Sequence, residues 1–253
     1  MHLKRLAYLL IEKALSYATD RIVCISEAER ETALRERVCG EKKLCLIPNG
    51  IDIAKIEAAI PIKRSEIGFR SDDFVVGMIG RLTRQKAPDI FVKAATLIQQ
   101  KIPESVFVIV GNGELTTQVE DFAKEHGLRL LVTGWVDNPY SYLKTFDVAV
   151  LLSRWEGFGL AIAEYMAARK PIVATRVDAI PTLVSDGTDG FLVDVDSPIM
   201  AAESVTYIYN HKKEAETMVE NAYKKVKAKY DIRRVAEQHL KLFSTLTGGV
   251  KMK

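Results

Sequence analysis

The sequence predicts an α/β fold in which a Rossmann-like parallel sheet is covered by helices on both faces. From residue 74 onward, short apolar runs alternate several times with longer segments of helical periodicity. The runs are apolar at nearly every position, as expected for parallel strands that are buried on both sides. Parallel strands need crossover connections, so a doubly wound open sheet is the simplest topology. Such a sheet binds ligands beyond the carboxyl ends of its strands.

The chain begins with an amphipathic helix. Apolar residues recur at helical spacing from Leu3 through Leu10 to Ala18, and Lys4 and Arg5 give the opposite side a basic flank. We interpret it as a helix that faces a core, with docking on a membrane surface as the alternative. The apolar run is too short for a signal peptide or a transmembrane span.

Residues 21–25 form one strand, which is followed by the polar stretch 27–37 and the turn Pro48-Asn49-Gly50. One strand cannot make a sheet. It either joins the edge of the main sheet or is the last piece of a second domain.

The main domain supplies the remaining elements. Its expected strands are residues 74–79, 106–110, 130–133, 148–152, 172–174 and 190–193. Helical segments are expected between them at 89–100, 114–126, 139–145, 160–169 and 181–185. Helices at 200–211, 214–230 and 231–246 follow, and the glycine pair 248–249 is expected in a frayed tail.

Composition excludes several classes of protein. The 253 residues include 36 Lys and Arg against 33 Asp and Glu, a balance that does not suit a nucleic-acid binder but leaves room for one local anion site. The three cysteines form no C-x-x-C pair, which argues against a disulfide framework or a zinc knuckle. We therefore expect a cytoplasmic protein, peripheral at a membrane if the first helix docks there.

Two loops after strands are candidate phosphate sites. Gly80, Arg81 and Lys86 lie in the loop between the first main strand and its helix, where a phosphate would meet fixed positive charge and a helix N-terminus; the alternative is a solvated surface loop. Gly111 and Gly113 follow the next strand. They fit a dinucleotide fingerprint poorly, because a threonine replaces its third glycine, so an NAD-linked oxidoreductase is only a weak alternative to a tight turn.

Residues 153–164 are the most specific stretch. Glu156 follows a strand, Gly157 and Gly159 free the backbone for close approach to a ligand, and Glu164 falls within the first two turns of the next helix. Carboxylates do not bind phosphate, so a phosphate cradle between two of them predicts a ligand with hydroxyl groups on both sides of its phosphates. A nucleotide sugar has this shape. The alternative for either glutamate alone is an ordinary surface charge.

Other motifs carry less chemistry. Asp194 and Asp196 imitate a D-x-D metal site, but we interpret Asp196-Ser197-Pro198 as a helix N-cap followed by proline near the first turn. The four histidines are scattered, so no metal site is expected. Trp135 follows the third main strand and could stack on a base, although a packing role is the favoured interpretation.

Taken in order and spacing, residues 80–86, 111–114, 133–135, 153–164 and 171–175 resemble the carboxy-terminal half of family 4 glycosyltransferases. The resemblance implies a GT-B fold and retaining hexosyl transfer from a nucleoside-diphosphate sugar in polysaccharide or glycoconjugate biosynthesis, with no metal and no cofactor. Arg81 and Lys86 would hold the diphosphate, Glu156 would meet sugar hydroxyls, and Glu164 would bind the ribose. The expected donor-binding set is completed by Gly80, Gly111, Gly113, Trp135, Gly157, Phe158, Gly159 and Leu160.

The resemblance also implies a domain division. Residues 1–47 would be the terminal fragment of an acceptor-side domain, 48–72 a linker, 73–230 the donor-binding domain, and 231–253 a crossover helix and tail. The family's Gly-Gly-x-x-Glu loop is replaced here by residues 177–182, which puts its sugar contacts in doubt. Expected partners are a nucleotide sugar, an acceptor, and the rest of the first domain or a partner chain. The alternative function is a non-catalytic donor-lobe subunit.

Overall fold

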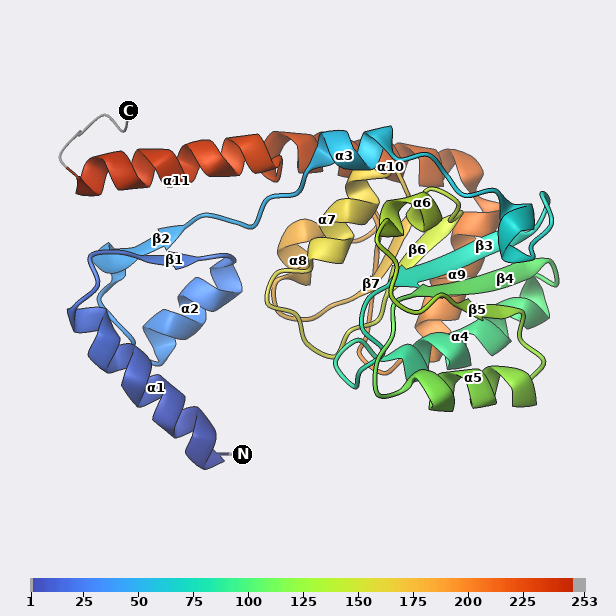
Figure 1. Cartoon of the computed structure of the whole chain (residues 1–253), viewed down its shortest axis with the longest axis horizontal. Coiled ribbons are helices and arrows are strands. Elements are labelled where there is room, and N and C mark those ends of the chain that lie inside the picture. The colour runs from blue at the N-terminus through green and yellow to red at the C-terminus, as the bar shows by residue number, and fades with distance from the viewer. Residues whose placement is uncertain (1, 248–253) are drawn as a thin grey trace.

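The protein has a small N-terminal part and a larger α/β domain, which are joined by an extended segment (Figure 1). This computed structural model describes the backbone from His2 to Thr247 and the side chains from Leu6 onward. The expected frayed tail at 248–249 lies outside the described residues.

The larger domain is built on a six-stranded sheet in the order β5-β4-β3-β6-β7-β8, in which every pair is parallel. The strands are β3 (Phe74–Ile79), β4 (Ser105–Val110), β5 (Leu130–Val132), β6 (Val148–Leu151), β7 (Ile172–Thr175) and β8 (Phe191–Val193). The predicted fold class is thus confirmed. Because the strand order reverses between β3 and β6, the loops that leave these two strands flank the topological switch point.

Helices cover both faces of this sheet. One face packs on α4 (Pro88–Lys101), α5 (Thr116–Glu125) and α9 (Pro198–Asn210). The other packs on α3 (Ile53–Ala58), α6 (Pro139–Leu143), α7 (Leu160–Ala167), α8 (Ile180–Leu183) and α10 (Lys212–Lys229). Each layer contributes its own apolar cluster, which is why the central strands are buried from both sides.

The N-terminal part has its own sheet. β1 (Ile22–Cys24) pairs in parallel with β2 (Leu44–Leu46), a strand that the sequence reading missed, so the alternative that residues 21–25 join the main sheet is wrong. The polar stretch after β1 is a helix, α2 (Glu27–Arg35), whose Glu29 amide donates to the Ser26 hydroxyl at its N-cap. Between α2 and β2 lies a 3₁₀ turn, Glu41–Lys43, and a second one, Arg64–Ile67, precedes β3.

The first helix, α1 (His2–Tyr17), does not face a core in this chain. Large apolar side chains such as Leu6, Leu10 and Leu15 are more than half exposed, so the core-facing interpretation is wrong for the described side chains. Those of Leu3, Lys4 and Arg5 lie outside the described set. None of the helices in the described part is long and apolar enough to cross a membrane.

The chain passes between the two parts twice, and the two passages are joined. The Ile51 amide donates to the carbonyl of Tyr230 and the Ile232 amide donates to the carbonyl of Ile51, both at 2.9 Å. From there α11 (Ile232–Leu246) runs back over the N-terminal part (Figure 1). Among its described residues only Val235 is buried, and Phe243 remains about half exposed.

Candidate functional site

The predicted phosphate loop and the predicted cradle meet at the switch point. Lys86, in the loop after β3, forms an ion pair with Glu156, in the loop after β6. Their side chains are only 15% and 7% exposed, and the Ser153 hydroxyl also donates to Glu156 Oε1 at 2.7 Å. The structure therefore brings together two residues that lie 70 positions apart and rejects the interpretation of Glu156 as a surface charge.

Arg81 lies on the open side of the same loop. Its side chain is exposed, and its guanidinium makes one long contact, at 3.5 Å, with Gln85 Oε1. Within the described residues no carboxylate pairs with it, so its charge remains unpaired at the carboxyl edge of the sheet. Gln85 in turn donates to the carbonyl of Trp155 at 3.0 Å, a second link between the two loops.

Gly111 and Gly113 allow the loops after β3 and β4 to touch. A Cβ at Gly111 would come within 2.2 Å of the Gly80 carbonyl oxygen, and one at Gly113 within 2.4 Å of the Leu82 carbonyl oxygen. Where the two loops touch, the Leu82 amide donates to the carbonyl of Asn112 at 2.9 Å. These glycines thus make the expected tight turn and position the loop that carries Arg81.

The cradle is formed where β6 leads into α7. Gly159 has a φ of +93° at the N-cap of α7, a backbone conformation that favours glycine. Phe158 is buried edge-on against Tyr230, while Leu160 is exposed and the Ile25 side chain lies 4.0 Å from where a Cβ would stand on Gly157. Gly157 itself is exposed, so its backbone is accessible from solvent.

Glu164 projects from α7 against a tyrosine that the sequence analysis did not identify. The Tyr140 hydroxyl, from α6, donates to Glu164 Oε1 at 3.0 Å. Burial raises the pKa of the Glu164 carboxyl, while the Tyr140 hydrogen bond and the positive charge of Lys86 act in the opposite direction. Glu164 is thus a partly buried carboxylate within the electrostatic reach of Lys86, as the spacing from Glu156 predicts.

Arg154 links the loops that follow β3, β6 and β8. Its guanidinium makes a two-pronged ion pair with Asp89 at 3.1 and 2.7 Å and also contacts Asp196 at 2.7 Å. It donates further to the carbonyl of Arg84 at 2.9 Å, and its amide donates to that of Gln85 at 2.8 Å. One side chain therefore joins the ends of β3, β6 and β8, which spacing alone does not reveal.

The structure tests the predicted N-cap of α9, the packing role of Trp135 and the loop 177–182. The N-cap of α9 is Ser197, within the predicted Asp196-Ser197-Pro198 cap, and the Asp196 carboxylate is held by Arg154. Trp135 is 79% exposed, so the favoured packing role is wrong. Asp178, in the departing 177–182 loop, has a φ of +42° and accepts the Glu156 amide at 2.8 Å, which fixes the start of the cradle.

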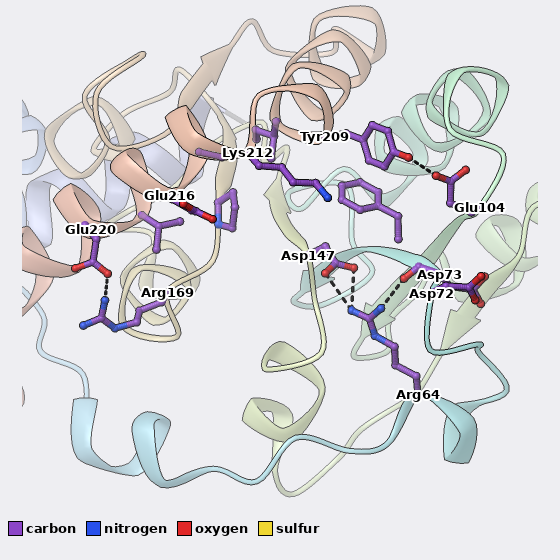
Figure 2. Close-up of a pocket in the computed structure, with 15 residues that line it drawn as sticks. Arg64, Asp72, Asp73, Glu104, Asp147, Arg169, Tyr209, Lys212, Glu216 and Glu220 are labelled. Atoms are coloured by element: carbon purple, nitrogen blue, oxygen red, sulfur yellow. Dashed lines mark hydrogen bonds and ion pairs between the residues drawn. The ribbon is translucent and has the colours of Figure 1, made fainter.

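A cavity of about 780 Å³ lies at the opposite, amino-terminal edge of the sheet (Figure 2). Most of its charged side chains are paired with neighbours: Arg64 with Asp147, Arg169 with Glu220, and Glu104 with Tyr209. These contacts join helices or turns to residues that precede strands, whereas the predicted set lies at the carboxyl edge of the sheet. Among the described side chains of residues 6–247, no group of three His, Cys, Asp or Glu could hold a metal.

Comparisons with known proteins identify the family of this chain. A family model described as glycosyl transferases group 1 matches residues 59–225. A UDP-Gal:alpha-D-GlcNAc-diphosphoundecaprenol alpha-1,3-galactosyltransferase of Escherichia coli is 37% identical over 213 residues, which are 80% of this chain and 55% of the relative. The structure of Anabaena HepE with UDP and glucose superposes with a TM-score of 0.80 at 22% identity, covering 89% of this chain and 63% of that one.

A further comparison is with a single solved domain. The C-terminal domain of LpcC, a group 1 glycosyl transferase of Francisella tularensis, superposes over its whole length on 72% of this chain, with a TM-score of 0.65 and 24% identity. The chain thus spans little more than half of its E. coli relative, while one solved C-terminal domain fits within it completely. With a family model that matches more than half of its residues, this chain belongs to the group 1 glycosyltransferases.

Proposed function

We propose that this chain carries the donor-binding lobe of a retaining hexosyltransferase that uses a nucleoside-diphosphate sugar. The observation that supports this most is the Lys86–Glu156 ion pair at the switch point, with Glu164 within the electrostatic reach of Lys86 and the unpaired charge of Arg81 on the same loop. The cations suit a diphosphate and the carboxylates suit the hydroxyls on either side of it. Trp135, exposed beyond β5, would stack on the base.

In the proposed reaction, the bond between the anomeric carbon and the diphosphate oxygen breaks. The acceptor oxygen bonds to that carbon on the face that the diphosphate leaves, and the acceptor proton passes to the departing diphosphate. Arg81 and Lys86 offset the negative charge that develops there, so no metal is needed. The Lys86–Glu156 ion pair would hold Glu156 beside the sugar hydroxyls, with the accessible backbone around Gly157 completing the contact.

The acceptor and the first domain are part of the proposal. The E. coli relative is named for a lipid-linked acceptor, and we propose an acceptor of that class, with the enzyme at the cytoplasmic membrane surface. We propose further that residues 1–47 are the terminal fragment of an acceptor-side domain and that 48–72 link it to the donor-binding domain 73–230. The rest of the acceptor-side domain would then cover the exposed apolar side chains of α1 and α11.

The test is nucleotide binding in the presence of EDTA. We expect one of UDP, GDP, ADP or their sugars, at 100 times its dissociation constant, to stabilise the chain by about 2.7 kcal/mol, or about 5–11 °C in melting temperature. Glu164→Ala is the control variant and should bind markedly more weakly. No stabilisation by any of these ligands, or stabilisation that requires a divalent metal, contradicts the proposal.

A non-catalytic donor-lobe subunit is the second candidate, which the exposed apolar residues of α1 and α11 favour as a surface for a partner. Both candidates bind the nucleotide sugar, and the chain alone should transfer very slowly. Adding a chain that carries an acceptor-side domain distinguishes them. Transfer that appears in the mixture identifies half of an enzyme, and binding of both chains without transfer identifies the non-catalytic subunit.

A further inference from the structure

The contact between Tyr140 and Glu164 joins two elements that are far apart in sequence. Tyr140 comes from α6, a single turn after β5, and Glu164 from the middle of α7. The phenol packs against the same apolar cluster as the helix, and its hydroxyl donates to Glu164 Oε1 at 3.0 Å. The ring is therefore anchored in the core while its polar end reaches the carboxylate.

The phenol is suited to hold a carboxylate. Burial and the neighbouring Glu164 charge raise the pKa of Tyr140, so its hydroxyl keeps its proton and remains a donor at neutral pH. A carboxylate in a partly buried site needs hydrogen bonds to remain ionised and to keep one orientation. Of the two Glu164 oxygens, Oε1 is engaged by the phenol and Oε2 has no hydrogen-bond partner within the described residues.

We propose that Tyr140 is a positioning residue, which fixes the Glu164 carboxylate so that Oε2 accepts a ribose hydroxyl of the nucleotide donor. This inference rests on the proposed function and adds a residue to it. Loss of the phenol hydroxyl lets the carboxylate rotate or bind water, which weakens ribonucleotides. Loss of the ribose hydroxyl removes the same interaction from the other side, so the two changes are not additive.

Tyr140→Phe is the decisive variant, because it keeps the ring and removes only the hydroxyl. Tyr142→Phe is the matched control: Tyr142 lies on the same helix, and its hydroxyl has no hydrogen bond within the residues that the structure describes. Melting temperatures establish that the variants fold. Calorimetry then gives the affinities for UDP, GDP and ADP and for the 2′-deoxy and 3′-deoxy form of each.

We expect the wild type and Tyr142→Phe to prefer the ribonucleotide over one deoxy form, and Tyr140→Phe to lose about tenfold in ribonucleotide affinity with little loss for that deoxy form. Glu164→Ala should abolish the preference, and adding Tyr140→Phe to it should change nothing more. An unchanged preference in Tyr140→Phe, or equal losses for both nucleotide forms, overturns the positioning role of Tyr140 and leaves the proposed function unaffected. A wild type that binds none of the nucleotides overturns the proposed function and this inference together.

Discussion

Removal of the Arg154 guanidinium should destabilise the loops at the carboxyl edge of the sheet. Its side chain is 17% exposed and that of Asp89 is 23%, so Arg154→Ala leaves a largely buried carboxylate without its two-pronged partner. Breaking such a pair costs about 3 kcal/mol. In a domain of this size the melting temperature should fall by about 6–12 °C.

Arg176→Ala is the matched control. This arginine also pairs with an aspartate, Asp186, in a loop near the carboxyl edge of the sheet, but the two side chains are 49% and 42% exposed. An exposed pair contributes about 0.5 kcal/mol, so its loss should shift the melting temperature by about 1–2 °C.

Thermal unfolding followed by circular dichroism measures the stability, and calorimetry measures nucleotide affinity. Because Arg154 also holds the Arg84 and Gln85 backbone, Arg154→Ala should weaken nucleotide binding as well, whereas Arg176→Ala should not. Arg154→Lys, which keeps the charge but not the planar fork, should recover only part of both losses. A melting temperature for Arg154→Ala that matches that of Arg176→Ala would refute the conclusion that Arg154 holds these loops together.

Two further predictions concern the strand ends. Gly113→Ala places a Cβ 2.4 Å from the Leu82 carbonyl oxygen, so the loop must shift and nucleotide affinity should fall at least tenfold, while Gly40→Ala, in open space, should have no effect on the affinity measured by calorimetry. Hydrogen bonds from Arg129 lower the pKa of Asp73 to about 2, so this carboxylate stabilises the fold above about pH 4 and that contribution is lost as the pH falls toward 2. Asp73→Asn should therefore melt lower than the wild type at pH 7 and alike near pH 2; a constant difference between the two melting curves would contradict the assignment.

The central strands were predictable because their burial on both faces leaves a continuous apolar signal. The N-terminal part shows where such signals end. β2 has three residues and is defined by its pairing with β1, which periodicity cannot reveal. α2 has no buried residues, so the sequence shows no apolar periodicity there. Its start was nevertheless predictable, because Ser26 followed three residues later by Glu29 is typical of a helix N-terminus.

The candidate site divides in the same way. Glycines and charges that follow strands predicted the Lys86–Glu156 region, because parallel strands deliver such loops to one edge. The residues that hold these groups were not predictable, since Tyr140 and Glu164 are 24 positions apart and Arg154 and Asp89 are 65 apart. Their pairing depends on how helices pack on the sheet, for which a single sequence has no fixed spacing.

The backbone bridge between Ile51 and the start of α11 has a mechanical consequence. Two main-chain hydrogen bonds and the pairing of Ile51 with Asp231 hold the two passages together where the chain enters and leaves the larger domain. Ile25 of the N-terminal part lies 4.0 Å from where a Cβ would stand on Gly157. Because the bridge is made of main-chain atoms, side-chain substitution cannot easily remove it, and it fixes the two passages against each other at the point where α11 begins.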